Sequence, residues 1–441
     1  MTVIYMVNLL DRFSMGLLLQ PIKVELRLSD TQLGFLTGIA FGLFYALFGL
    51  PIARWADRGD RVTIASLAIG LWGLTVMTCL FVTTFAQLAL ARMAAAVGES
   101  GCKPPTYSLV GDYFPQPAER TRAMSIYWLG SPLATLISFI AGGWLNQLYG
   151  WRITLFVMGI PGLLLAVLVK LTLRDPRAPV TGSAMPAAPL RAPQPSLIMV
   201  LRVLWHRKSC RHLTIALILF FTMGFGLSPW NAAFMMRSHG MSSAELGVWM
   251  GLIISVGGIV GVLSGGYIAN RWFGGNERGQ MRLSAVTTML SVPCYVAFLT
   301  LPQKHAALFM LMPTMLVFNL FVAPTYALMQ RLVPDTMRAT TMAVVMLLYN
   351  LIGMGVGPQL VGILSDGLQP KVGGDSLRYA MLIVSFVSVW SAYHFWKAGQ
   401  TIKEDLSQVE EELQRDAQRE GAPSVLILAP DPPASTATIR V

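Results

Sequence analysis

Charged side chains inside long apolar runs are the residues of this 441-residue chain best placed to do chemistry. Two such runs carry Asp11, Arg12, Arg92 and Glu99, and Lys103 follows Glu99 by four residues. An ionisable group at depth in a bilayer costs several kcal/mol unless it is paired or faces water. Burial and a neighbouring arginine act in opposite directions on a carboxyl group, so its protonation can depend on conformation. This is the chemistry that coupling to a proton requires.

Helical geometry relates these residues to one another. Arg92 and Glu99 are two turns apart and share one helix face, and Lys103 adds a neighbour one turn further on. Asp11 lies about 15 Å along its helix and Glu99 about 20 Å along its own, both deep in a bilayer. Adjacent residues such as Asp11 and Arg12 point about 100° apart, so they need different partners. We predict a carboxylate–guanidinium cluster that lines a central cavity, and the alternative is a static ion pair that fixes helix packing.

The composition identifies the solvent of this chain as a lipid bilayer. Hydrophobic residues make up 54% of the sequence, charged residues 12%, and the mean hydropathy is +0.58. The charged share is about half that of a soluble domain, which argues against a soluble enzyme and against disorder. The net charge of +11 does not indicate nucleic acid as a partner, because the basic residues lie mostly between apolar runs. We therefore expect membrane lipids around the chain.

The apolar runs predict an all-α membrane protein with twelve transmembrane helices. The predicted spans are 1–22, 31–53, 63–83, 86–110, 123–146, 153–173, 213–236, 244–269, 283–301, 306–330, 339–365 and 379–397. Lysine and arginine are concentrated in the loops on the side of the N-terminus. This asymmetry predicts cytoplasmic N- and C-termini, and we expect a bacterial inner-membrane location.

The spans divide into two pseudo-symmetric six-helix bundles. We predict an N-terminal bundle over 1–173, a cytoplasmic linker with an amphipathic interfacial segment over 174–212, a C-terminal bundle over 213–399, and a cytoplasmic tail over 400–441 that is partly helical with a disordered end. The segment 53–58 resembles 266–271, and 119–123 resembles 335–339. Both pairs are about 215 residues apart, which indicates the internal duplication expected of a two-bundle transporter.

Aromatic and polar residues in several spans are candidates to complete the substrate cavity. They are Tyr127, Trp230, Asn231, Tyr326, Tyr349 and Asn350. The alternative is that these side chains make ordinary hydrogen bonds between helices.

No enzyme motif is found in the sequence. It has no Gly-Lys dipeptide and therefore no Walker A loop, and it contains neither HExxH nor GxSxG. The four cysteines form no CxxC pair and fit small core positions, so we expect no metal site, disulfide framework or cofactor.

The loop between the second and third spans resembles the signature loop of the major facilitator superfamily. Ala56, Asp57, Arg58 and Arg61 match that signature, while Ala53 replaces its first glycine. The resemblance implies the major facilitator fold. It also implies a gating network in which Asp57, Arg58 and Arg61 meet the loop before the fifth span, at Arg120 or Arg122.

Two further motifs resemble the spinster branch of that superfamily. The segment 8–13 resembles its Asn-x-x-Asp-Arg-Phe, and the segment 92–99 resembles its Arg-x₅-Gly-Glu. The resemblance implies proton-linked transport of lysolipids or sphingolipid-like amphiphiles. Asp11 and Glu99 would then carry protons, with Arg12 and Arg92 as partners. Lys103 lies outside the pattern and could hold Glu99 ionised or meet an anionic substrate.

These observations together predict a monomeric secondary active transporter that works by alternating access and is driven by protons. A transporter or exporter of a small organic anion or a drug is the main alternative to a lipid transporter. A membrane-embedded enzyme lacks a polar catalytic cluster here, and a transport-dead sensor would use the charged tail to contact a partner. The chain begins only ten residues before Asp11, so we expect the natural start to lie further upstream.

Overall fold

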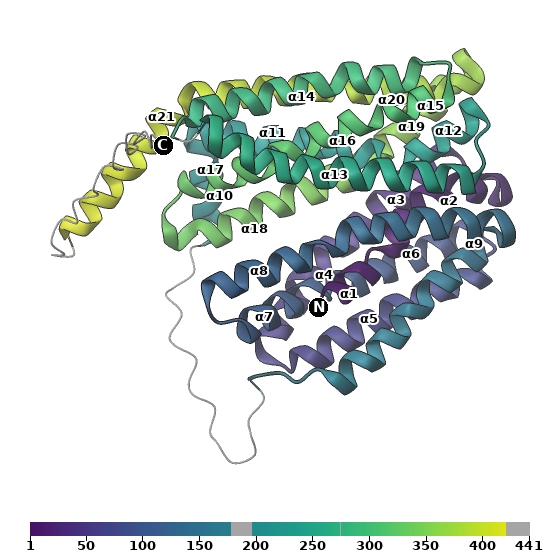
Figure 1. The fold of residues 1–441 in the computed structure, drawn as a ribbon, viewed down its shortest axis with the longest axis horizontal. Helices are drawn as coiled ribbons and strands as arrows, with labels where there is room; N and C mark the ends of the chain where they lie inside the picture. Colours follow the sequence, from purple (N-terminus) through teal and green to yellow (C-terminus); the bar gives the residue numbers. More distant parts are fainter. Residues whose placement is uncertain (178–195, 274, 420–441) are drawn as a thin grey trace, which may run out of the picture.

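The structure is a computed structural model that describes residues 1–177, 196–273 and 275–419. Its described residues form helices and contain no strand (Figure 1). Without water in a bilayer core, each backbone N–H and C=O group needs an internal partner, and a helix supplies these within one segment. The predicted all-α fold is confirmed.

The first half of the chain folds into ten helical segments. They are α1 (Thr2–Val7), α2 (Leu10–Leu26), α3 (Asp30–Thr37), α4 (Ile39–Arg58), α5 (Arg61–Thr78), the 3-10 turn Cys79–Phe81, α6 (Phe85–Ser100), α7 (Lys103–Tyr113), α8 (Pro117–Trp128) and α9 (Gly130–Thr172). Ser29 and Thr84 cap α3 and α6 by accepting from the backbone of Gln32 and Gln87, whose side chains accept in return. Gly150 has φ of 80° and divides α9 into two passes.

The second half repeats this arrangement. It contains α10 (Leu197–His206), α11 (Lys208–Leu227), α12 (Trp230–His239), α13 (Ser243–Phe273), α14 (Glu277–Thr300), α15 (Lys304–Phe309), α16 (Leu311–Leu320), α17 (Val322–Arg331), the 3-10 turn Asp335–Met337, α18 (Arg338–Tyr349), the π-helical turn Asn350–Met354, α19 (Gly355–Val372), the 3-10 turn Gly373–Asp375, α20 (Ser376–Ser385) and α21 (Val387–Arg419). Gly353, Gly355, Gly357 and Pro358 lie in or directly after the π-helical turn. The predicted span 339–365 is therefore not a continuous α-helix.

Nine helical stretches among the described residues are long and apolar enough to cross a membrane. Two of them hold two passes each, because the chain reverses at Gly150 and again at the 3-10 turn Gly373–Asp375. The α6–α7 segment provides a further pass, which carries the charges of the central cluster. The twelve predicted passes are therefore accounted for.

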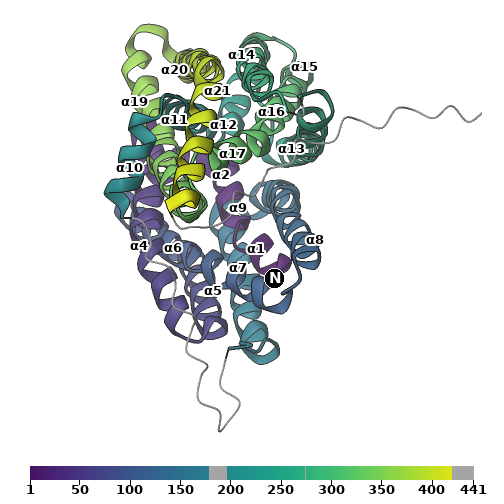
Figure 2. The ribbon, with the colours of Figure 1, turned by 90° about the vertical axis from the view of Figure 1, so that its left-hand side faces the viewer.

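The two halves form two bundles that lie side by side, as Figures 1 and 2 show from two directions. We call the end that carries residues 57–61, 112–122 and 174–177 the linker end, and the end that carries residues 23–30, 237–240 and 366–376 the closed end. The bundles touch through α3 against α19 and through α9 against α13. The described hydrogen bonds and ion pairs between the halves lie from the closed end down to Ser255, whose hydroxyl donates to Pro132 near the middle of α13.

Backbone lies directly against backbone where the halves meet. A methyl group on Gly38 would lie 2.4 Å from the carbonyl oxygen of Gly355, and one on Gly143 would lie 2.4 Å from that of Ser243. Contacts this short leave no room for a Cβ atom, so glycine is required at both positions for the helices to approach as they do.

A polar network, which we call the closed-end lock, joins the bundles around Asp30. The Asp30 carboxylate accepts two hydrogen bonds from Arg237, at 2.8 Å each, one from Lys23 at 2.5 Å and one from Ser365 at 2.6 Å. Asp366 in turn accepts from the first backbone amides of α3, at 3.0 Å and 2.7 Å. Arg237, Ser365 and Asp366 belong to the second half, so these bonds hold this end shut.

The helix α10 and the end of α21 lie together at the linker end. Val200 and Leu204 of α10 and Leu406 of α21 are buried in one apolar cluster, while Trp205 is exposed. The backbone amide of Ser209 donates to Asp405 at 2.6 Å, so a carboxylate from the tail caps α11. The predicted disordered end of the tail and the central part of the predicted linker lie outside the described residues.

Candidate functional site

Asp11 occupies a fully satisfied position at the centre of the first bundle. The helix is interrupted between Val7 and Leu10, and Asp11 follows in the first turn of α2. One carboxylate oxygen accepts from the indole N–H of Trp72 at 2.8 Å, and the other accepts from Arg92 at 2.6 Å. The side chain is completely buried. Both oxygens have a donor, so this ion pair is suited to a permanent place in the packing.

Glu99 is paired but poorly hydrogen-bonded. Its nearest cation is Arg12, whose Nη2 lies 2.6 Å from Oε1, yet neither Glu99 oxygen receives a well-aligned hydrogen bond from the part of the chain that the structure describes. Glu99 has no exposure, whereas the Arg12 side chain is 22% exposed. Arg12 therefore stands between the buried carboxylate and solvent. A buried carboxylate without full hydrogen bonding is the member of the cluster that gains most from taking up a proton.

Aromatic rings surround the arginines. The centroid of the Phe41 ring lies 4.7 Å from the guanidinium carbon of Arg12 and 4.9 Å from that of Arg92, so one ring contacts both cations. The Tyr45 ring lies 5.3 Å from Arg12. Cation–π contacts of this kind stabilise a guanidinium group away from water without neutralising it.

Lys103 does not continue the helix face that carries Arg92 and Glu99, although the sequence predicts that it does. Helix α6 ends at Ser100 and α7 begins at Lys103, because Pro104 and Pro105 cannot donate to the preceding turn. The Lys103 ammonium lies 5.6 Å from the centroids of both the Tyr5 and the Tyr45 rings. Among the described residues, it makes no ion pair with an acidic side chain.

The aromatic and polar candidates fall into two groups. Tyr326 donates to Tyr349 at 3.0 Å, and the Tyr349 ring stacks on that of Phe221 with centroids 4.1 Å apart. Asn350 is half-buried and opens the π-helical turn. Tyr127 is buried behind Tyr5, stacked on it with ring centroids 4.8 Å apart.

Trp230 and Asn231 lie in the packing of the second half. The Trp230 indole donates to the carbonyl oxygen of Pro358 at 3.2 Å, and Asn231 accepts from the Tyr295 hydroxyl at 2.6 Å. Both residues are almost completely buried. Their bonds hold α12 against α19 and α14 and do not point to the charge cluster.

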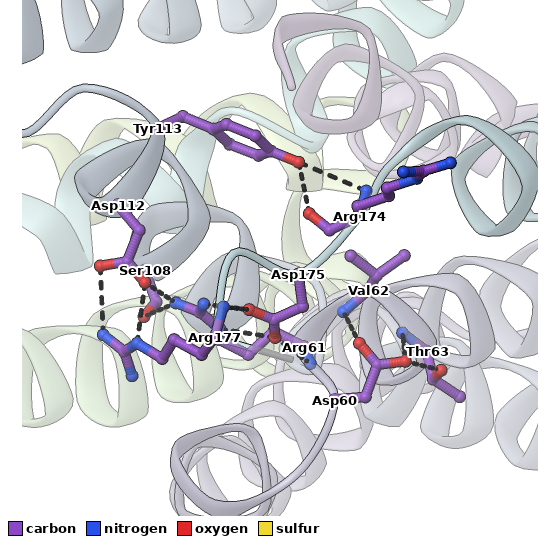
Figure 3. A network of polar contacts seen from close by, with 10 residues as sticks. All are labelled: Asp60, Arg61, Val62, Thr63, Ser108, Asp112, Tyr113, Arg174, Asp175 and Arg177. Carbon is purple, nitrogen blue, oxygen red and sulfur yellow. Dashed lines mark hydrogen bonds and ion pairs between the residues drawn. The ribbon is translucent and has the colours of Figure 1, made fainter. Parts of the chain in front are cut away.

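A second polar network lies at the linker end of the first bundle (Figure 3). Arg61 at the start of α5 pairs with Asp175 after α9 and with Asp112 in α7, the latter at 2.7 Å, and it donates to Ser108 at 2.8 Å. Arg177 adds an ion pair to Asp112 at 2.8 Å. This network ties three helix ends of one bundle together.

Asp175 is held in its charged form by this network. Burial alone would raise its pKa, but hydrogen bonds from the Arg61 side chain and from the backbone amides of Arg177 and Arg61 lower the pKa of Asp175 to about 2. Asp60, next to Arg61, has a lowered pKa as well: burial opposes the shift, and hydrogen bonds from Thr63, Val62 and Lys170 outweigh it.

The other residues of the predicted gating loop lie on the surface of the linker end. Asp57, Arg58 and Arg122 are exposed. Arg120 donates to the carbonyl oxygens of Phe114, Gly111 and Pro115, and it thereby caps the end of α7. The described contacts of Arg120 therefore lie within the first bundle.

Comparison with known proteins agrees with this architecture. The family model described as Major Facilitator Superfamily matches residues 1–358. The chain belongs to the Major Facilitator Superfamily. It is a membrane transporter and not an enzyme.

Two relatives and one solved structure cover almost the whole of this transporter. An MFS-type efflux pump of Mycolicibacterium smegmatis is 32% identical over 90% of this chain and 91% of its own. Protein spinster homolog 1 of Xenopus tropicalis is 25% identical over 92% of this chain and 81% of its own. The crystal structure of a bacterial homolog of the human lysosomal transporter Spinster, inward-facing and unoccupied, superimposes with a TM-score of 0.79 at 27% identity and covers 92% of this chain and 96% of its own.

Several residues of the transporter's cluster have no signal in the sequence. Trp72, Phe41, Tyr45 and Tyr5 are aromatic residues in aromatic-rich apolar helices, where nothing distinguishes a partner of a charge from a packing residue. Asp112 and Asp175 are charged residues outside or at the edge of a span, and such residues are usually solvated.

No group of three or more histidine, cysteine, aspartate or glutamate side chains among the described residues is arranged to hold a metal ion. All four cysteines are free thiols, and three of them are buried.

Proposed function

We propose that the chain is a proton-coupled transporter that moves an amphipathic, lipid-like molecule across the bacterial inner membrane, with Glu99 as the main proton site. Asp11 supports this role by holding Arg92 in place, because its own oxygens are already bonded to Trp72 and Arg92. The termini lie on the cytoplasmic side, and the protein works as a monomer.

A single observation carries the proposal: among the described residues, the completely buried Glu99 carboxylate has only the partly exposed Arg12 as its ion-pair partner and lacks aligned hydrogen bonds. Protonation of Glu99 removes one charge and releases Arg12 from its ion pair. The two protonation states therefore favour different positions of Arg12, and Arg12 lies where solvent enters the cluster.

Alternating access follows from the way the halves meet. The closed-end lock holds one side shut, so the cluster communicates with the linker end, which we assign to the cytoplasm. When the bundles rock, the lock separates and the linker end closes, and the loop containing Asp57 and Arg58 forms the opposite contact in the proposal. The arrangement of the major facilitator fold and the polar network around Arg61 support rigid-body movement of the first bundle.

The substrate class in this proposal is an amphiphile, because tyrosine and phenylalanine rings surround the charges of the cluster. The similarity to the sphingosine-1-phosphate transporter SPNS2 of Danio rerio, 25% identical over 88% of this chain and 80% of its own, supports a lipid-like substrate. Export of a drug-like compound is the second candidate, since the relative with 32% identity is named an efflux pump.

The test compares wild-type protein with Glu99→Gln in proteoliposomes that carry a pH gradient. Fluorescent lysophosphatidylethanolamine is the lipid probe and ethidium is the drug probe. We expect gradient-driven movement of one probe by the wild type, and a fall to the level of empty liposomes in Glu99→Gln, because the amide does not change its protonation state near neutral pH.

Glu245→Gln is the matched control, since Glu245 is a partly exposed glutamate whose ion pairs with Lys304 and His305 lie within the second half. This variant should transport like the wild type. Gradient-driven movement at the wild-type rate in Glu99→Gln would remove Glu99 from the coupling mechanism, and movement of ethidium alone would select the second candidate.

A further inference from the structure

Lys103 is a half-buried cation that the ion pairs of the central cluster leave unbalanced. The charged side chains that interact with Glu99 are Arg12, Asp11, Lys103 and Arg92. Asp11 pairs with Arg92, and Glu99 pairs with Arg12. Two carboxylates thus stand against three cations, and the positive charge of Lys103 has no acidic partner among the described residues.

The surroundings of Lys103 provide rings and hydroxyl groups but no counter-charge. The ammonium lies 5.6 Å from the ring centroids of Tyr5 and Tyr45. Tyr107, one turn further along α7, packs edge-on against the Tyr127 ring, which stacks on Tyr5. Rings of this kind stabilise an ammonium group only in part, because they supply no negative charge. An uncompensated cation at this depth favours the entry of an anion.

We call Lys103 and the rings of Tyr5 and Tyr45 the cage. The second half reaches it through the π-helical turn Asn350–Met354, which packs against α4, the helix that carries Tyr45. Tyr5, Tyr45 and Tyr107 belong to the first half, whereas Tyr349 and its hydrogen-bonded partner Tyr326 belong to the second. An anion bound at Lys103 can accept hydrogen bonds from the ammonium group.

An apolar cluster lies next to the cage and also spans the halves. It consists of Phe41 and Ala96 from the first half and Met354 from the second, with Phe44, Tyr45 and Phe225 packed against them. Tyr45 belongs to both sets of contacts. A ligand with a charged head at Lys103 can therefore place an apolar chain against this cluster.

We propose that Lys103 and the surrounding tyrosines form the headgroup site of the substrate and select an amphiphile whose head carries a phosphate or carboxylate anion. The proposal rests on the proposed function, because it takes the central cluster as the substrate site. In this proposal the Lys103 ammonium group binds the ligand, and Glu99 takes up and releases the proton. Neutral and cationic heads leave the charge of Lys103 uncompensated and bind more weakly.

Binding to the purified full-length chain in nanodiscs tests this assignment. Three probes share one oleoyl chain and differ in the head: oleoyl lysophosphatidic acid carries a phosphate, oleate a carboxylate, and monoolein no charge. We expect the wild type to bind at least one anionic probe about tenfold more tightly than monoolein, which is the worth of one charge-assisted hydrogen bond. The stronger of the two anionic probes identifies the headgroup.

Four variants complete the test. Lys103→Gln should bind the anionic probes no better than monoolein, while Lys103→Arg should keep the preference. Lys304→Gln, a lysine at the other end of the molecule, should behave like the wild type. Glu99→Gln should keep the anion preference even though it loses proton-driven transport, so failure of the proton role is distinguishable from failure of the headgroup site.

Two results overturn the headgroup site. The first is a wild type that shows no preference for either anionic probe over monoolein. The second is a folded Lys103→Gln protein, judged by its thermal unfolding midpoint, that keeps the preference in full.

Discussion

At the scale of single residues, the two carboxylates of the central cluster differ in how completely they are satisfied. Asp11 has a donor on each oxygen, whereas Glu99 has one ion pair without aligned hydrogen bonds. A buried carboxylate with a hydrogen-bond donor on each oxygen resists protonation and movement. A buried carboxylate that lacks such donors can be protonated and can move more easily. The division of labour between the two acids follows from their neighbours and not from their chemistry, which is the same.

Trp72→Phe tests the structural role of Asp11. The phenylalanine ring cannot donate to Asp11, so a buried carboxylate oxygen loses its partner, and we expect a loss of about 1–3 kcal/mol in stability. A lower thermal unfolding midpoint in detergent would show this. Trp205→Phe, at an exposed tryptophan of α10, is the control and should leave the midpoint unchanged.

Asp175→Asn tests the network around Arg61 through its pH dependence. A carboxylate whose pKa is lowered to about 2 stabilises the folded chain at neutral pH, and this contribution is lost as the pH falls from about 4 towards 2. We therefore expect the variant to unfold at a lower temperature than the wild type at pH 7. The two midpoints should converge as the sample is acidified below pH 4. A constant difference at all pH values would contradict the role of the charge.

The sequence identifies the charged members of the cluster but not their pairing. The depths of Asp11 and Glu99 follow from helical rise, and the separation of Arg92 and Glu99 follows from helical periodicity. The partners depend on the rotation of one helix against another, which is set by packing across the bundle. For this reason the bond from Trp72 to Asp11 has no sequence signal, and the separation of Lys103 from Glu99 depends on a helix break at Gly101–Cys102.

At the scale of helices, hydropathy predicts where the passes lie but not where they bend. The breaks at Asn8–Leu9 and at Gly38 and the π-helical turn Asn350–Met354 fall inside predicted spans. Each break occurs where a neighbouring helix comes close, as Gly38 does to Gly355. Such breaks depend on tertiary contacts, which a pattern of apolar residues does not contain.

Asp405→Ala tests the contact between the tail part of α21 and α11. Asp405 is buried and accepts from the backbone of Ser209 in the first turn of α11, so its removal leaves that amide without a partner. We expect a loss of about 1 kcal/mol, the usual cost of removing a helix cap. The thermal unfolding midpoint measures it, and Glu410→Ala on the exposed face of α21 should have no effect.

At the scale of the whole molecule, the closed-end lock joins the two halves at one end. Asp30 connects the first half to Arg237 and Ser365 of the second, and Asp366 holds the start of α3. These contacts oppose the separation of the bundles at this end.

Asp30→Asn should shift the population towards opening at the closed end, because the amide cannot accept the two charged hydrogen bonds of Arg237 as the carboxylate does. Spin labels at Val24→Cys and Gln369→Cys, in a chain with Cys294→Ser, report the distance between the halves by pulsed electron resonance. We expect a new population at longer distance in Asp30→Asn.

Asp375→Asn is the matched control, since Asp375 pairs with Arg378 inside the second half. It should leave the distance distribution unchanged. An unchanged distribution in Asp30→Asn would mean that the lock does not control opening.

The glycine contacts between the bundles have a consequence for the speed of transport. The backbone of Gly143 contacts the backbone of Ser243, and the backbone of Gly38 contacts that of Gly355. The space between them is too small for a single methyl group. Where main chain meets main chain, no side chains interdigitate between the bundles. The bundles can therefore tilt without side chains at these positions having to repack. In Gly143→Ala, the added methyl group would push α9 away from α13. We expect this variant to transport more slowly than the wild type even though every charge of the cluster stays in place.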